Sequence, residues 1–141
     1  MFRTILLSVD LNDPKGSEKP ARAAQELAAL MGSELHVVNV VPDYGMAMVG
    51  SFFGAGQAAR ALEESKAAMH RWAARSLPEV PEDRLHVVKG TVYDRILSVS
   101  ERIGADVIVV GAHRPELEDY LVGPNSARVV RHANQSVIVI R

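Results

Sequence analysis

The chain has 141 residues, enough for one domain of ordinary size and too few for two. Apolar residues make up 48% and charged residues 23%, as in a typical globular protein. The formal net charge is −1, which argues against a nucleic-acid binder, because such proteins carry a basic surface. The chain has no cysteine, so a disulfide framework and a zinc knuckle are both excluded.

The N-terminal residues 1–10 contain a short apolar run. A signal peptide needs a longer apolar stretch followed by a small-residue cleavage site, whereas this run ends after Val9 in an acid and a turn. The uncharged segment 44–56 is too short and too rich in glycine for a membrane span. We therefore expect a cytoplasmic protein without membrane insertion.

Five short runs of apolar, mostly β-branched residues predict strands. They cover residues 4–9, 35–41, 85–88, 106–110 and 136–140. Their near-continuous apolar character favours parallel strands that are covered on both faces.

The segments between these runs have apolar residues at helical spacing, which predicts helices there. Ser17 is the predicted N-cap of the first helix, with Pro20 in its first turn and Gly32 at its end. Gly104 is expected to end the third helix. Trp72 lies at helical spacing in the second helix, where a core position is expected. The alternation of strands and helices predicts one α/β domain over residues 1–141.

We expect a doubly wound, open parallel sheet of five strands with helices on both faces, a Rossmann-like fold. The predicted strand order is 3-2-1-4-5, because this order creates a switch point between the first and fourth strands.

The segment 44–56 breaks the pattern. It has no charge, four glycines and no consistent period, so we interpret it as a loop or a partly helical lid after the second strand. Its apolar side chains could form a surface for a protein partner or fold back onto the sheet or a ligand, and both alternatives stay open. These side chains are Met46, Met48, Val49, Phe52 and Phe53.

Ligands of open parallel sheets bind beyond the carboxyl ends of the strands. The segment 123–126 follows the fourth strand and precedes a predicted helix. Glycine and small polar residues at a helix start let backbone N–H groups approach an anion, which the helix dipole favours. The alternative is an ordinary helix N-terminus with Asn125 or Ser126 as its cap.

Three C-terminal stretches resemble the signature of the universal stress protein family. They are residues 111–115, 120–133 and 136–141, and residues 4–10 resemble the first strand of that family with its terminal acid. The nucleotide-binding branch carries Gly-x-x-Gly, nine residues, then Gly-Ser/Thr. Here Arg114 replaces the second glycine, the spacer is one residue shorter, and Pro124 replaces Ser/Thr.

The form His113-Arg114-Pro115 with a later Gly-x-Asn is similar to a variant branch whose members also hold ATP. The resemblance therefore implies ATP, alone or with Mg²⁺, as the ligand. Arg114 is expected to offer its charge to phosphate oxygens in place of backbone amides.

The resemblance also implies roles for individual residues. Asp10 would contact the adenosine end, Val40 would meet adenine through its backbone, and Gly111 would lie close to ribose and phosphates. On residue type alone, Asp10 is more commonly a turn former and Val40 a core residue. The implied cofactor-binding residues are Ser8, Val9, Asp10, Val40, Val110, Gly111, His113, Arg114, Gly123, Pro124, Asn125 and Ser126.

No catalytic constellation stands out, and the histidines lack metal-ligand spacing. His36 and His86 are expected in the sheet, and His70 and His132 on helix surfaces. We expect a nucleotide-dependent regulatory protein of the stress response that acts on an unknown protein partner. A slow ATPase and a nucleotide-independent interaction module are the alternatives.

The last predicted strand, 136–140, is apolar and uncharged and lies at the edge of the expected sheet. Such an edge is a template for pairing, so we expect a homodimer through this strand. The resemblance implies the same edge, with tetramers in some relatives. A monomer whose last strand is shielded by a helix is the alternative.

Overall fold

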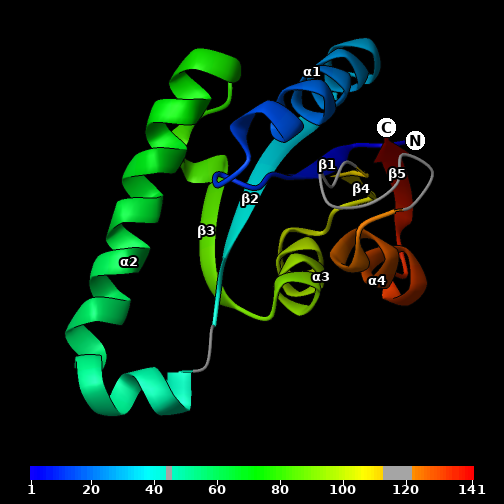
Figure 1. Ribbon diagram of the computed structural model, residues 1–141. Coiled ribbons are helices and arrows are strands. Elements are labelled where there is room, and N and C mark those ends of the chain that lie inside the picture. Colours follow the sequence, from blue (N-terminus) through cyan, green and yellow to red (C-terminus); the bar gives the residue numbers. More distant parts are fainter. Residues whose placement is uncertain (44–45, 113–121) are drawn as a thin grey trace.

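The computed structural model describes residues 1–43, 46–112 and 122–141, with the backbone alone for residues 46–55. Strands and helices alternate along the chain (Figure 1). The strands are β1 (Thr4–Ser8), β2 (Glu34–Pro42), β3 (Leu85–Gly90), β4 (Val107–Gly111) and β5 (Ser136–Ile140). The helices are α1 (Pro14–Met31), α2 (Met46–Ser76), α3 (Val92–Ile103) and α4 (Pro124–His132), and a 3₁₀ turn, η1 (Glu82–Arg84), precedes β3.

The five strands form one parallel sheet in the order β3-β2-β1-β4-β5. The predicted α/β fold class and strand order are thus confirmed. The chain runs outward from β1 to one edge and then returns to β4 on the other side of β1. The switch point between β1 and β4 therefore lies where it was expected.

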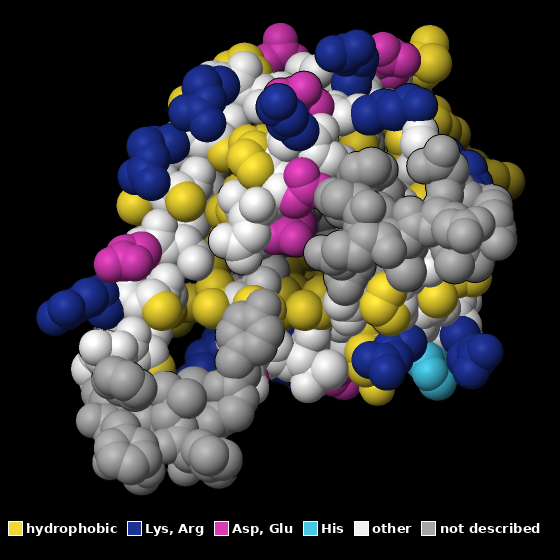
Figure 2. Space-filling view, viewed as in Figure 1, with side chains coloured by type: hydrophobic (Ala, Val, Ile, Leu, Met, Phe, Trp, Pro, Cys, Tyr) yellow, Lys and Arg dark blue, Asp and Glu magenta, His cyan; other side chains and the backbone are white. Residues whose placement is uncertain are grey.

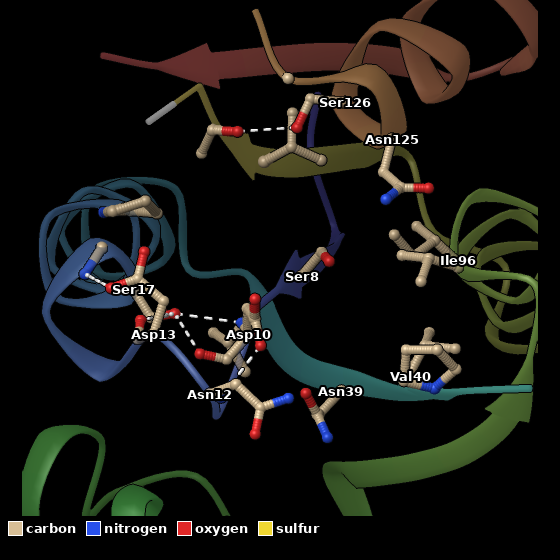
Figure 3. Close-up of a pocket in the computed structure, with 18 of the residues that line it drawn as sticks. Ser8, Asp10, Asn12, Asp13, Ser17, Asn39, Val40, Ile96, Asn125 and Ser126 are labelled. Carbon is tan, nitrogen blue, oxygen red and sulfur yellow. Dashed lines mark hydrogen bonds between the residues drawn. The ribbon is translucent and has the colours of Figure 1, made fainter. Parts of the chain in front are cut away.

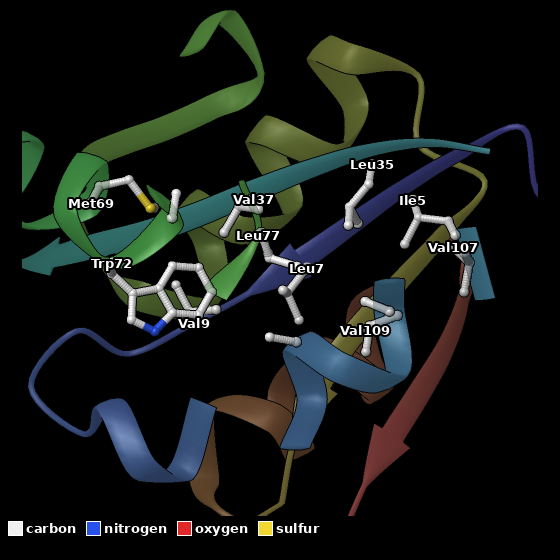
Figure 4. Packing of buried hydrophobic residues seen from close by; sticks show 13 residues of the cluster. Ile5, Leu7, Val9, Leu35, Val37, Met69, Trp72, Leu77, Val107 and Val109 are labelled. Carbon is white, nitrogen blue, oxygen red and sulfur yellow. The ribbon is translucent and has the colours of Figure 1, made fainter. Parts of the chain in front are cut away.

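Each face of the sheet carries its own hydrophobic cluster, because successive side chains of a strand point to opposite faces. Ile5 and Leu7 of β1 pack under α1 and α2 together with Trp72 (Figure 4), whereas Leu6 packs under α3 and α4. Trp72 is buried, which confirms its expected core position. Two-sided burial explains why the strands read as continuous apolar runs.

The ends of the helices were predicted in part. Gly32 and Gly104 end α1 and α3 with φ of 62° and 68°, in the left-handed region that favours glycine. The predicted N-cap Ser17 is wrong, because α1 begins at Pro14 and is capped by Asp13. The Asp13 carboxylate accepts a hydrogen bond from the Gly16 N–H at 3.1 Å.

Gly16 makes this early start of α1 possible. A Cβ at this position would lie 2.1 Å from Oδ2 of Asp13, so a side chain would displace the cap. Ser17 and Pro20 consequently lie inside the helix, where both are buried.

Helix α2 begins earlier than predicted. Residues 46–56, interpreted from the sequence as a loop or a partly helical lid, belong to this helix, which changes direction after its first turns (Figure 1). Tyr44 and Gly45 lie outside the described residues, and only the backbone is described for residues 46–55. The lid and partner-surface hypotheses, which depend on the apolar side chains of this segment, therefore stay predictions. None of the helices in the described ranges combines the length and apolar character that crossing a bilayer requires.

The histidines occupy the expected kinds of position. His36 and His86 lie on β2 and β3, and His70 and His132 are exposed on α2 and α4. On the face shown in Figure 2, Lys and Arg side chains lie scattered, with Asp and Glu side chains between them.

Candidate functional site

A cavity of about 660 Å³ lies beyond the carboxyl ends of the central strands (Figure 3). Residues from the ends of β1, β2 and β4, from the start of α1, and from the N-terminal parts of α3 and α4 form its walls. The cavity lies at the switch point of the sheet, where open α/β folds bind their ligands.

Most of the site residues proposed from the sequence meet in this cavity, although they come from four separate parts of the chain. His113 and Arg114 lie outside the described residues. The proposed residues that line the cavity are Ser8, Val9, Asp10, Val40, Val110, Gly111, Gly123, Pro124, Asn125 and Ser126.

Asp10 follows β1 and lies in a tightly bonded turn. Its carboxylate accepts a hydrogen bond from the Asn12 N–H at 2.9 Å, and its carbonyl accepts one from the Asp13 N–H at 3.0 Å. Asp10 is therefore a turn former, as its residue type alone suggested. It is also exposed and lines the cavity, so the two roles are compatible.

The end of β2 contributes one apolar and one polar residue. Val40 belongs to the buried cluster that also contains Ile96 of α3, and both line the cavity together with Val92. Asn39 points to the other face of β2, where its Oδ1 accepts a hydrogen bond from the Leu11 N–H at 3.2 Å. The cavity thus combines an apolar wall with a polar rim near Asp10.

The N-terminus of α4 forms the opposite wall. Gly123 is buried at the N-cap position, Pro124 is the first helical residue, and among the described residues no side chain caps the helix. The alternative that Asn125 or Ser126 serves as the cap is therefore wrong. Instead, the Ser126 hydroxyl donates a hydrogen bond to the Gly111 carbonyl at 2.7 Å, which ties the start of α4 to the end of β4.

The N–H groups in the first turn of an α-helix have no acceptor within the helix, and the helix dipole places a partial positive charge there. In α4 these groups belong to residues that line the cavity. This wall can hold an anion, while the carboxylate of Asp10 at the other wall can accept hydrogen bonds from hydroxyl groups.

Gly111 has a structural role of its own. A Cβ at this position would lie 3.1 Å from Cγ of Pro20, so glycine allows α1 to approach the end of β4 closely. Pro20 also lines the cavity. The packing of α1 is a second reason, besides ligand contact, for a glycine here.

Sequence reasoning missed several residues of the cavity. Val92 and Ile96 could have been found from the rule that helix starts surround a switch point. Asn39 lies inside an apolar strand, and the only feature of the sequence that distinguishes it there is its polar side chain. The missed residues are Asn12, Asp13, Gly16, Ser17, Pro20, Asn39, Pro42, Val92 and Ile96.

Comparison with known proteins gives consistent results. The profile of the universal stress protein family matches residues 1–141. Universal stress protein G of Escherichia coli O157:H7 is 31% identical over 145 residues, covering 100% of both chains. Universal stress protein A homolog 1 of Coxiella burnetii is 30% identical over 142 residues, covering 99% of this chain and 96% of the homolog.

Solved structures share the fold. The hypothetical protein MJ0577 superposes with a TM-score of 0.78 at 22% identity, covering 99% of this chain and 96% of its own. A universal stress protein solved in complex with cAMP gives a TM-score of 0.66 at 18% identity, covering 99% of this chain and 97% of its own.

Proposed function

This chain belongs to the universal stress protein family, and from that premise we propose that its cavity binds ATP and that nucleotide occupancy regulates an unknown protein partner in the stress response. The observation that carries the proposal is the polarity of the cavity. A helix N-terminus with a buried glycine forms one wall, and the carboxylate of Asp10 lies at another.

This polarity orients a nucleotide. The phosphates belong at Gly123 and Asn125, where helix N–H groups and the helix dipole favour negative charge. The nearby carboxylates of Asp10 and Asp13 would repel phosphates and instead suit ribose hydroxyls. The apolar surface of Val40 suits the flat face of a base.

The size of the cavity supports a ligand of this class, since about 660 Å³ falls within the usual range for small-molecule sites. The universal stress protein solved with cAMP holds another adenine nucleotide in the same fold. We propose that His113 and Arg114 complete the phosphate end, and that Mg²⁺, if it accompanies ATP, neutralises phosphate charge there.

A regulatory role fits the residues of the cavity better than catalysis. The hydroxyls of Ser17 and Ser126 are both engaged with backbone carbonyls, so neither is prepared as a nucleophile. We propose that ATP is a bound signal in the cytoplasm and that any hydrolysis is slow.

We further propose that the protein is a homodimer joined through β5. This strand lies at an edge of the sheet, and four of its five side chains are partly exposed. It has no charged residue to prevent pairing with a second copy. A two-fold axis at this edge would make the interface self-complementary.

The test of ATP binding uses Gly123→Val. Gly123 has φ of −59° and ψ of 153°, which valine also adopts, so the backbone can stay in place. The side chain would fill the space of a phosphate, and we expect calorimetric ATP affinity to fall by about a hundredfold or more. Gly56→Val makes the same change at an exposed position of α2 and should leave ATP binding unchanged.

Three other outcomes separate the alternatives. Unchanged ATP affinity in Gly123→Val would contradict the phosphate site at α4. A native chain that binds no ATP at all would favour the nucleotide-independent interaction module. Steady formation of ADP by the native chain, absent in Gly123→Val, would favour the slow ATPase.

A further inference from the structure

We propose that Asn39 and Ser17 are positioning residues, which hold the β1–α1 turn so that the carboxylate of Asp10 faces the nucleoside end of the cavity. The proposal rests on the proposed nucleotide binding and adds the residues that organise one half of that site.

Asn39 anchors the turn from β2. Its side chain is more than nine-tenths buried, with 6% exposed, although the residue lines the cavity. Because the Leu11 N–H can only donate, the amide of Asn39 must present Oδ1 to it, at 3.2 Å. A neighbouring strand thus fixes the backbone directly after Asp10.

Ser17 anchors the same turn from α1 and is also buried, with 4% exposed. Its Oγ accepts a hydrogen bond from the Asp10 N–H at 3.1 Å. Its single proton is shared between the carbonyls of Asp10 and Asp13, both at 3.2 Å from Oγ. Ser17 therefore holds both backbone polar groups of Asp10.

These two anchors come from different elements and fix successive peptide groups. Figure 3 shows Ser17 and Asn39 on the two sides of Asp10. The Asp10 carboxylate has one oxygen occupied by the Asn12 N–H. Its second oxygen has no hydrogen bond to any described residue, and this oxygen is left for a ligand. Residues that lock a binding group before the ligand arrives raise affinity by reducing the ordering that binding requires.

The inference predicts an effect confined to one part of the nucleotide. Loosening the turn should weaken contacts with adenosine, because Asp10 lies at that end. Contacts at the α4 end come from a separate part of the chain and should not change.

A double-mutant cycle tests this prediction with adenosine and inorganic tripolyphosphate as separate ligands. Asn39→Leu and Ser17→Ala are each made in the native chain and in Asp10→Ala. In the native background, each change should lower adenosine affinity about tenfold, the size expected for one lost hydrogen bond that orders a site. In the Asp10→Ala background the loss should be about twofold or less, and tripolyphosphate binding should stay constant.

Ser100→Ala is the matched control. Ser100 is also fully buried and donates to the Leu97 carbonyl at 2.7 Å, but it does not line the cavity. It should leave affinity for adenosine and tripolyphosphate unchanged. Amide hydrogen exchange at Leu11 and Asn12 should become faster in Asn39→Leu and stay slow in Ser100→Ala.

Several outcomes would overturn the proposal. Equal losses of adenosine affinity with and without Asp10 would show that Asn39 and Ser17 support the fold and do not act through Asp10. Unchanged adenosine affinity in both single variants would have the same consequence. A native chain that binds neither ATP nor adenosine would instead refute the proposed function on which the inference rests. If Asn39→Leu fails to fold, the double-mutant cycle of Ser17→Ala with Asp10→Ala tests the proposal by itself.

Discussion

The two edges of the sheet differ in charge. Edge strand β5 has no charged residue, and its side chains from Val137 to Ile140 are partly exposed. Edge strand β3 carries Lys89 and is preceded by Arg84. Since charges at an edge discourage pairing with another chain, β3 is the better protected of the two edges, and the proposed homodimer uses the uncharged edge. One sheet can therefore have one edge suited to assembly and one suited to solvent.

The charged edge is organised as a chain of hydrogen bonds. Nη2 of Arg102 lies 3.3 Å from Nδ1 of His86, Nε2 of His86 lies 2.9 Å from Nδ1 of His36, and Nε2 of His36 lies 2.8 Å from the Glu34 carboxylate. Arg84 approaches the same carboxylate at 3.4 Å.

Because arginine can only donate and a carboxylate can only accept, the direction of every proton in this chain is fixed. His86 then donates through Nε2 to Nδ1 of His36, and His36 donates through Nε2 to the Glu34 carboxylate. A proton added at Nδ1 of His86 would remove the acceptor of the Arg102 hydrogen bond. The predictions below change the charge at each edge in turn.

The largest expected effect follows from placing a charge on β5. Val139→Lys would give this edge the character of β3, and we expect the homodimer to dissociate, with its Kd raised by about a hundredfold or more. Sedimentation at micromolar concentration measures the change. A native protein that sediments as a monomer there would contradict the dimer itself.

A second variant separates assembly from folding. Val139 also packs against the cluster under α3 and α4, so lysine at this position costs stability within the chain. Ser136 is exposed at the start of β5, and Ser136→Lys adds a charge at the edge without loss of packing. It should weaken the dimer less than Val139→Lys and leave the melting temperature of the monomer unchanged.

A moderate effect is expected from acid at the β3 edge. Burial, the neighbouring His36 and then Arg102 lower the pKa of His86 from 6.5 to about 4. The unfolded chain therefore binds a proton at higher pH than the folded chain does. The stabilisation is fully present above pH 6.5 and is lost as the pH falls toward 4.

Because His86 is only half-buried, we expect a loss on the order of 1 kcal/mol from this group. Urea unfolding at pH 7 and pH 5 measures it, with His86→Gln as the variant that cannot titrate. The decline in stability between the two pH values should be smaller in His86→Gln than in the native chain. An equal decline in both proteins would rule out His86 as the source.

The smallest effect is expected from Arg102→Gln. Removing the guanidinium should raise the pKa of His86, since its positive charge disfavours the protonated ring. At pH 7 the free energy of unfolding should change by less than about 1 kcal/mol, as is usual for an exposed contact. An NMR titration of the His86 ring gives the pKa directly, and an unchanged value would exclude this contact.

The sequence by itself determined the strands, the fold class and most of the candidate site. Residues 4–9 and 136–140 read as continuous apolar runs because the strands are buried on both faces or packed at the edge. Gly32 and Gly104 marked helix ends because only glycine adopts the left-handed conformation without strain. Cavity-lining residues such as Asp10 and Gly123 could be predicted because ligands of open parallel sheets bind at strand ends and helix starts, which are local positions in the sequence.

Only the tertiary structure decided which side chains organise that site. The start of α1 depends on the contact between Asp13 and Gly16, so Ser17, which resembles a cap in the sequence, lies inside the helix and bonds to Asp10. Asn39 reaches Leu11 across 28 positions of the chain, and no local pattern encodes such a contact. Short-range conformational preferences depend on neighbouring residues and can be predicted from the sequence. Hydrogen bonds between distant segments form only when the sheet has brought those segments together.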